Sequence, residues 1–295
     1  MAFDLYFKVL FLLTLKAAGF EALEVTEHNA CDVCSCGPGP SLHPKELVKC
    51  TDFEALIEFS SLPAFVRGVH IENGQKGVSF KRGSIKVKKS YKISVNKASY
   101  VDFAEKSTTL WTGANMTIDI DHVGHLSMKS RSVSSTSGNF VLKVDNTVQV
   151  DIEGQAFDVM TSVSLSSIGQ LNLAPAAFRP NAPLSLQKPQ TKIEFSNIGM
   201  IPGLPMEAFS SAQSISFVNC KITDIESTAF SGMSVHNVTF ESSIIERIHS
   251  SAFPDQNFVE HLSFLNCTLI SISEKADLRH IRTETFTYQF FIHKP

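Results

Sequence analysis

The chain has 295 residues, of which 43% are hydrophobic and 23 are phenylalanine, a composition that excludes a disordered chain and allows a long core. This length fits one or two globular domains. The net charge of −3 gives no long-range field that would recruit nucleic acid, so we expect no nucleic-acid partner.

Residues 1–22 have the features of a secretory signal peptide. Lys8 precedes a short apolar run and small residues follow it, so we expect cleavage between Gly19 and Ala22. The alternative, an uncleaved membrane anchor, needs about 20 apolar residues, and Lys8 and Lys16 bracket too few. No later stretch is long and apolar enough to span a bilayer. We therefore expect a secreted, extracellular protein without a membrane span.

Four of the six cysteines form a cluster just after this segment, namely Cys31, Cys34, Cys36 and Cys50. In an oxidising compartment, an even and closely spaced set favours two disulfides. Four thiolates can also hold zinc, but the single residue between Cys34 and Cys36 is poor for paired zinc knuckles. The cluster therefore predicts a disulfide-bonded region.

A spaced pair of apolar residues, written apolar-x-apolar, recurs nine times at intervals of 21 to 30 residues. The pairs are Val69/Ile71, Ile93/Val95, Ile118/Ile120, Leu142/Val144, Val163/Leu165, Ile193/Phe195, Ile215/Phe217, Val238/Phe240 and Leu262/Phe264. The two residues of a pair point the same way on a strand of period two. A fixed interval of this size indicates one structural unit stacked on the next, which is a solenoid.

Each later unit continues with apolar residues at fixed offsets after the pair, and a phenylalanine follows at an offset of thirteen. Phe157, Phe178, Phe230 and Phe253 keep this offset, and Phe209 slips by one residue. The spacing is that of one coil of the solenoid.

The repeat resembles that of the extracellular leucine-rich-repeat proteins, in a degenerate form. The resemblance implies an α/β fold: a horseshoe-shaped solenoid with a parallel concave β-sheet and short convex turns or helices. It also implies that the cysteine cluster is an N-terminal cap in which Cys31 pairs with Cys36 and Cys34 with Cys50. We accordingly expect a cap over residues 31–66, about nine repeats over 67–272 and a C-terminal tail or cap over 273–295.

Several features depart from that family. Isoleucine, valine and phenylalanine largely replace leucine, and the inward asparagine of the family is absent, so the backbone groups of the turn need other partners. The stretch between Gly124 and Phe140 loses the pattern and is interpreted as a polar loop. An insertion with three prolines, "RPNAPLSLQKP", begins at Arg179.

The two remaining cysteines, Cys220 and Cys267, occupy equivalent inward positions two coils apart, with Ser243 between them. Stacked strands lie about 4.8 Å apart, so these Cα atoms would be about 10 Å apart, beyond the roughly 7 Å limit for a disulfide. We expect two buried, free thiols.

No catalytic motif is present in the sequence. The alternative to a binding protein is a parallel β-helix enzyme acting on acidic polysaccharide, because such folds have coils of this length and use carboxylates with a basic residue. Its candidate residues are Asp119, Asp121 and Asp145, with His70, His122 and Lys143 nearby. A metal site made by His122, Asp119 and Asp121 is a weaker alternative. The simpler interpretation is a solvated polar face, and we expect no metal or cofactor.

Residues 80–97 carry seven lysines and arginines, which would suit anionic glycans but equally a solubilising face. Three acceptor sequences predict N-linked glycans on Asn115, Asn237 and Asn266.

These observations predict a secreted, non-catalytic recognition or adhesion protein that binds an extracellular protein or glycan. Glycans on Asn237 and Asn266 would cover the C-terminal half of the strand-lined face. A partner is therefore expected to use the N-terminal half, around His70, Asp119, Asp121 and Lys143.

Overall fold

The structure is a computed structural model that describes residues 22–25, 30–37, 47–135, 138–179, 191–209, 212–230, 234–253, 258–273 and 285–290. The predicted signal peptide lies outside these residues except for Ala22, and the proline-rich insertion does so except for Arg179.

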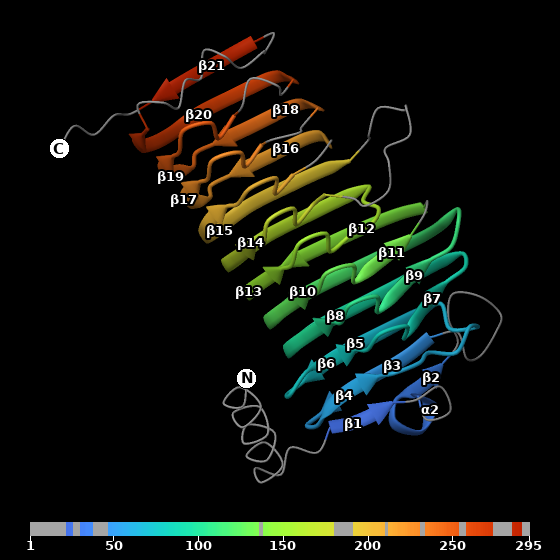
Figure 1. Ribbon diagram of the computed structural model, residues 1–295. Coiled ribbons are helices and arrows are strands. Elements are labelled where there is room, and N and C mark those ends of the chain that lie inside the picture. Colours follow the sequence, from blue (N-terminus) through green and yellow to red (C-terminus); the bar gives the residue numbers. More distant parts are fainter. Residues whose placement is uncertain are drawn as a thin grey trace, which may run out of the picture.

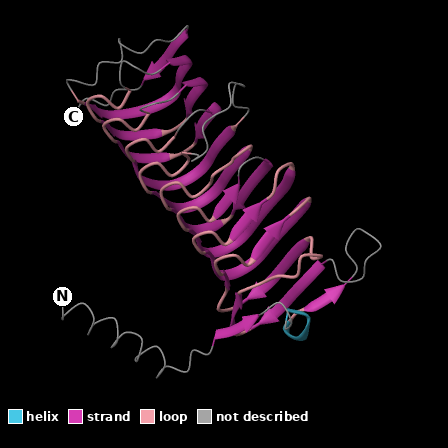
Figure 2. Cartoon of the chain, turned by 45° about the vertical axis from the view of Figure 1, so that its right-hand side comes forward, coloured by secondary structure: helices cyan, strands magenta, loops and turns pink. Residues whose placement is uncertain are grey.

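The chain forms a parallel β-solenoid whose coils stack along one axis (Figure 1). Figure 2 shows that strands dominate every coil. Each coil contributes one strand to a first face of the stack and another to a second face. The longer strands bend at a corner and belong to both faces, as β8 (Ser90–Phe103) does by pairing with β5 (Gly68–Gly74) and then with β6 (Val78–Phe80).

The first face contains β5, the first half of β8 and nine further strands in parallel register. These are β3 (Leu47–Phe53), β12 (Gly138–Asp145), β16 (Ala212–Val218), β18 (Ser234–Glu241), β21 (Thr285–Phe290), and the first halves of β10 (Ala114–Met128), β14 (Ser162–Leu173), β15 (Lys192–Leu204) and β20 (Phe258–Ile272).

The second face continues each coil beyond the corner. Besides β6 and the second halves of the long strands, it contains β1 (Ala22–Val25), β4 (Leu56–Phe59), β13 (Thr147–Ile152), β17 (Lys221–Ile225) and β19 (Ile244–Ile248). A short third face, made by β7 (Ile85–Val87), β9 (Thr108–Leu110) and β11 (Val133–Ser135), closes the N-terminal coils.

The corner between the first and second faces has one residue with positive φ in each coil from β3 to β20. This column comprises Asp52, Asn73, Lys97, His122, Asn146, Ser167, Asn197, Asn219, Ser242 and Asn266. Asparagine recurs because its short polar side chain tolerates the left-handed conformation better than most residues. The amides also join neighbouring coils, as where Asn219 donates to the side-chain oxygen of Asn197 at 2.8 Å.

The core lies between the faces and contains all nine apolar pairs, which are buried and aligned in register from Val69 to Leu262. Phenylalanine rings stack along the axis, for example Phe217 on Phe240 with ring centroids 4.9 Å apart. The same ring contact recurs along the axis because equivalent positions of neighbouring coils face each other. The repeat interval therefore identified the first face and its inward residues correctly.

The cysteines are placed as the sequence and the family resemblance imply. Disulfides join Cys31 to Cys36 and Cys34 to Cys50 beside the short helix α2 (Ala30–Val33) and β2 (Ser35–Gly37), which pairs antiparallel with β3. Cys220 and Cys267 are free and buried, and burial raises the pKa of the Cys220 thiol to about 11.

The predicted α/β leucine-rich-repeat horseshoe is wrong. About two thirds of the described chain is strand, and α2 is its only helix. Apolar residues that follow each pair at fixed offsets, such as Ile222 and Ile225, lie on β17, which pairs in parallel with β19. A second strand therefore stands where the horseshoe would place turns or helices, and the fold is a parallel β-solenoid.

The polar loop predicted between Gly124 and Phe140 is also wrong over its described part. This stretch contains the end of β10 and all of β11, and Ser127, Met128, Ser132 and Val133 are buried. Ser132 can be a core residue because its hydroxyl finds a backbone partner, donating to the carbonyl of Ala156 at 3.2 Å.

Candidate functional site

The outer side of the first face, over the N-terminal coils, collects the residues predicted to bind a partner. Lys49, His70, Ser94, Asp119 and Lys143 form one row across five neighbouring strands, because each is in register with the next. Every second residue of a strand faces outward, so the row is solvent-accessible while the apolar pairs are buried. Asp121 lies in the adjacent row, beside Asp145 on the next strand.

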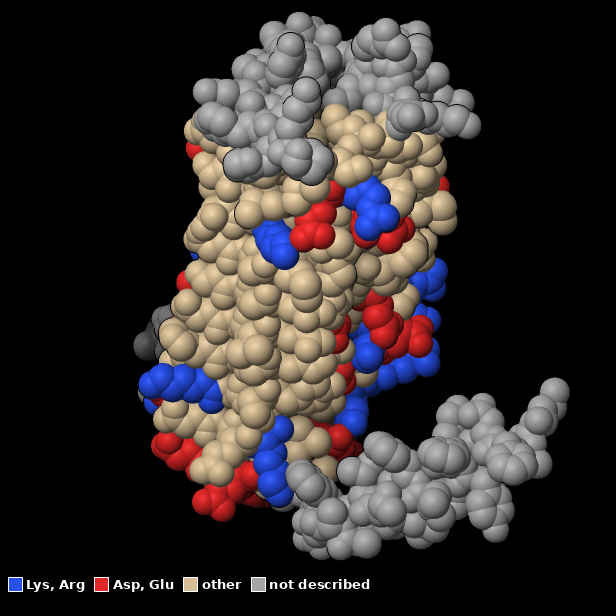
Figure 3. Space-filling model, turned by 90° about the vertical axis from the view of Figure 1, so that its left-hand side faces the viewer, with Lys and Arg blue, Asp and Glu red and all other residues tan. Residues whose placement is uncertain are grey.

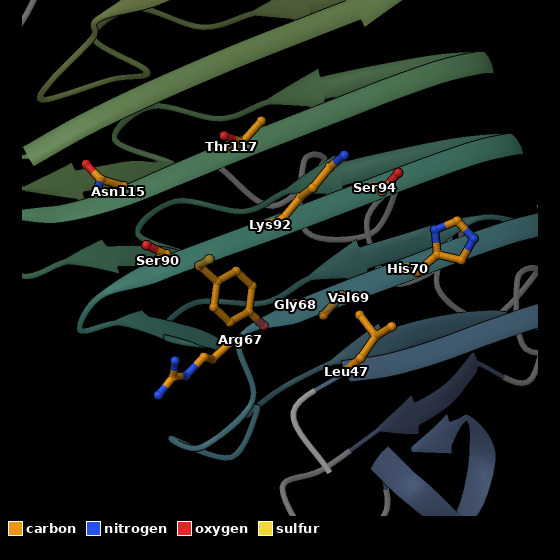
Figure 4. A pocket seen from close by; sticks show the side chains of 11 residues that line it. Leu47, Arg67, Gly68, Val69, His70, Ser90, Lys92, Ser94, Asn115 and Thr117 are labelled. Atoms are coloured by element: carbon orange, nitrogen blue, oxygen red, sulfur yellow. The ribbon is translucent and has the colours of Figure 1, made fainter. Parts of the chain in front are cut away.

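A groove of about 780 Å³ lies on this side of the stack (Figure 4). Its walls come from four adjacent strands, β3, β5, β8 and β10, and the residue Arg67 before β5. The lining includes His70, Lys92, Asn115 and Thr117, and Figure 4 shows Arg67 and His70 toward opposite ends. The groove, hereafter the first-face groove, therefore offers cationic and hydroxyl or amide groups together.

Tyr91 contributes a hydroxyl that has no hydrogen-bond partner among the described residues. The side chain lines the groove and is only 6% exposed, and burial raises the pKa of its phenol well above the ordinary value. The hydroxyl therefore stays neutral at physiological pH. A buried hydroxyl without a partner carries a free-energy cost, which a ligand or water reaching it would relieve.

Ion pairs hold the charged side chains next to the groove. The ammonium of Lys92 lies 3.2 Å from the Asp119 carboxylate, and His70 Nε2 lies 3.7 Å from Glu72. Both pairs are partly exposed, so they orient side chains more than they stabilise the fold. His70, Lys92 and Asp119 thus present both signs of charge in fixed positions.

Asp121 is held ionised by its neighbours. The Asn146 amide donates to its carboxylate at 3.0 Å and His122 Nδ1 lies 2.8 Å away. The hydrogen bond from Asn146, aided by His122, lowers the pKa of Asp121 against the opposing effect of burial. This carboxylate is a poor general acid, because a general acid needs a raised pKa. Among the described residues, no group of three or more His, Cys, Asp or Glu side chains could hold a metal.

The second face carries a polar network that was not predicted from the sequence. The Asp151 carboxylate accepts hydrogen bonds from Asn172 Nδ2 at 2.6 Å and Gln149 Nε2 at 3.0 Å. His125 Nε2 is hydrogen-bonded to the same carboxylate at 2.7 Å. Burial alone would raise the pKa of Asp151, but these hydrogen bonds outweigh it and lower the pKa. Tyr100 packs against His125 with ring centroids 5.4 Å apart.

A signal for this network was present in the sequence. Ser79, Asp102, Ser127, Asp151 and Asn172 share one outward row and recur at the interval of the apolar pairs. Extending the repeat to polar residues beyond the corner would have found them.

The three predicted glycan acceptors are all exposed. Asn115 lines the first-face groove and accepts a hydrogen bond from Asn139 at 2.8 Å, and Asn237 lies on the same face in the C-terminal half. Asn266 occupies the corner column. Their use as glycan sites stays a prediction.

No family model matches the chain, and neither a curated protein nor a solved structure matches it.

Proposed function

We propose that this protein is an exported recognition or adhesion module that binds an extracellular protein or glycan through the first-face groove. The observation that carries the proposal is the groove itself, which combines the cationic side chains of Arg67 and Lys92 with hydroxyl and amide groups and the unpartnered Tyr91 hydroxyl. The Asp119 carboxylate lies outside the lining and pairs with Lys92 beside it. Concave sites lined by a few fixed polar groups are typical binding sites.

Export is supported by the two disulfides, which persist in oxidising compartments. No helix in the described part of the chain is long and apolar enough to cross a membrane. Figure 3 shows one side of the stack on which basic and acidic side chains lie mainly toward the margins, with both signs interspersed. An interspersed distribution suits a defined partner better than a uniformly charged polymer.

A binding role without catalysis is supported by the state of the carboxylates. Hydrolysis of a glycosidic bond commonly needs two carboxyl groups, one of them kept protonated by a raised pKa. Asp119 is engaged in an ion pair with Lys92. The hydrogen bond from Asn146 lowers the pKa of Asp121, so this carboxyl group is not kept protonated.

The test compares two sets of substitutions on the outer side of the first face. The secreted protein is used to capture partners from its native extracellular fluid. We expect the combined variant His70→Ala, Asp119→Ala, Asp121→Ala and Lys143→Ala to lose the captured partner while secretion stays normal. The control Ser216→Ala with Ser263→Ala changes C-terminal positions on the same side and should retain it. Equal capture by both variants would refute the assignment.

The second candidate is a parallel β-helix enzyme acting on acidic polysaccharide. The observation in its favour is that the fold is a parallel β-solenoid with Asp121 and Asp145 adjacent on neighbouring strands. Incubation with polygalacturonate, followed by measurement of new reducing ends or unsaturated products, tests it. Product release by the wild type that disappears in Asp121→Asn would favour the enzyme over the binding module.

A further inference from the structure

The third face carries the only tryptophan in the chain, Trp111, and its ring is 53% exposed. The strand β9 ends at the buried Leu110, so the next side chain turns outward. Backbone hydrogen bonds fix the turn, because the Trp111 amide donates to Val87 at 2.9 Å and its carbonyl accepts from Ala114 at 2.9 Å. The large apolar ring is therefore displayed to solvent from a rigid position.

A shallow groove of about 400 Å³ adjoins this ring and is separate from the first-face groove. Its lining is rich in hydroxyl groups, with Thr109, Thr112, Ser134 and Ser135 around Trp111, Leu110 and Asp158. Thr109 and Ser134 are in register on adjacent strands. The Asp158 carboxylate accepts hydrogen bonds from the Ser134 hydroxyl at 2.9 Å and the Ser135 amide at 3.3 Å, so the acceptor is held in place.

Three exposed lysines stand beside this groove. Lys88 places its ammonium 5.1 Å from the centre of the Trp111 ring. Lys86 is in register with Thr109, and Lys89 follows on the same turn, where its carbonyl accepts from the Asn115 amide at 2.6 Å. No described carboxylate forms an ion pair with any of the three. Their charge is therefore available to a ligand.

We propose that the third-face groove binds an anionic oligosaccharide. The exposed indole ring stacks on the apolar face of a sugar ring, the hydroxyls and Asp158 bond to sugar hydroxyls, and the lysines neutralise an acidic group on a neighbouring unit. The acidic group is a sulfate or a carboxylate, since either satisfies a lysine ammonium. This inference does not depend on the function of the first-face groove.

Single-stranded nucleic acid is the other polymer that combines stacking with negative charge. The groove favours a sugar over it because its lining contains one aromatic ring, which offers no platform for successive bases.

The test uses the fluorescence of Trp111, which reports on this groove alone because the chain has no other tryptophan. The intact secreted protein is titrated with a heparin hexasaccharide, a galacturonate hexasaccharide, neutral maltohexaose and a thymidine hexanucleotide. We expect at least one acidic sugar to shift the emission to shorter wavelength and protect the ring from iodide. The two acidic arms distinguish sulfate from carboxylate. No change with either acidic sugar, or an equal or larger response to maltohexaose or the nucleotide, would overturn the proposal.

Matched variants locate the site by calorimetry. We expect Trp111→Ala to weaken binding of the acidic sugar by about tenfold or more, and Lys86→Gln with Lys88→Gln to weaken it by about fivefold and reduce its salt dependence. Met206→Ala, which removes a side chain 51% exposed, and Lys192→Gln on β15 are controls with unchanged affinity. Full affinity in the Trp111 variant would place the ligand elsewhere and refute the site.

Discussion

The N-terminal and C-terminal coils close the same solenoid in different ways. In the N-terminal coils the third face is a strand, and buried serines behind it form a ladder in which Ser84 donates to the carbonyl of Ser107, Ser107 to Ser132, and Ser132 to Ala156. In the C-terminal coils the equivalent column is alanine, and the residue after it is a buried phenylalanine. These rings form one stack of Phe157, Phe178, Phe209, Phe230 and Phe253.

The difference shows how one coil length supports two kinds of surface. A phenylalanine stack fills the corner with apolar volume, so on this side of the C-terminal coils these side chains are part of the buried core. A serine ladder satisfies the backbone with small residues, which leaves room for a third strand with outward side chains. Trp111 and its groove lie on that third face. The N-terminal coils therefore carry both candidate binding grooves.

The largest expected effect comes from breaking the phenylalanine stack. Phe209 is 1% exposed and lies between Phe178 and Phe230, with both centroid distances 5.6 Å. Phe209→Ala should lower the free energy of unfolding by about 3–5 kcal/mol because it leaves a cavity in a tightly packed column. Urea denaturation measures this. Phe65→Ala, which removes a side chain that is 53% exposed, is the control and should have little effect. Similar losses in the free energy of unfolding in both variants would show that the phenylalanine stack does not stabilise the fold.

Removing the disulfide at the N-terminal end should come next. Cys50 lies on β3, where the chain begins its first stacked coil, and its partner Cys34 is buried. Cys50→Ser should cut secretion strongly, since losing such a bridge typically removes about 2–5 kcal/mol of stability. Secretion yield and thermal denaturation report the effect, and Cys220→Ser is the matched control because that thiol is free. Normal secretion of the Cys50 variant would contradict a structural role for the bridge.

A smaller change tests whether the two corner designs are interchangeable. Ser107→Ala gives an N-terminal coil the alanine found at this position in the C-terminal coils, and it removes the hydrogen bond to Ser132 at 3.1 Å. We expect a loss of about 1 kcal/mol, the net contribution of one buried hydrogen bond. Ser107→Val adds volume and should cost more, about 1–3 kcal/mol, by overpacking. A neutral effect of both substitutions would show that the ladder is dispensable.

The sequence revealed only part of this architecture, for reasons visible in single residues. The apolar pairs identified the first face because strand alternation and the repeat interval agree. The corner after each pair hid the second face, since a residue in the left-handed conformation breaks the alternation, and Lys97 or His122 can occupy it as well as Asn146. The third face was hidden because buried serines such as Ser132 look like loop residues.

In the candidate site, too, some residues were predictable from the sequence and others were not. The outward row of His70, Asp119 and Lys143 was predictable from alternation, because outward residues follow directly from the inward ones. The Tyr91 hydroxyl was not, because its lack of a partner depends on packing around the start of β8. The environment of Trp111 required the third strand, which the sequence interpretation lacked.

The smallest expected effect is a pH dependence at the second face of the N-terminal coils. Hydrogen bonds from Gln149, Asn172 and His125 hold the pKa of Asp151 below its ordinary value in spite of partial burial. A folded pKa below the unfolded one adds stability above the unfolded pKa, about 4, and this is lost as pH falls through the folded value. Because 33% of the side chain is exposed, solvent screening keeps the contribution small.

Thermal denaturation from pH 6 to pH 2 should therefore show a slightly smaller loss of stability on acidification for Asp151→Asn than for the wild type. Glu194→Gln, on the exposed first face of a C-terminal coil, is the control and should follow the wild-type slope. A wild-type slope in the Asp151 variant would show that the network does not couple folding to this proton.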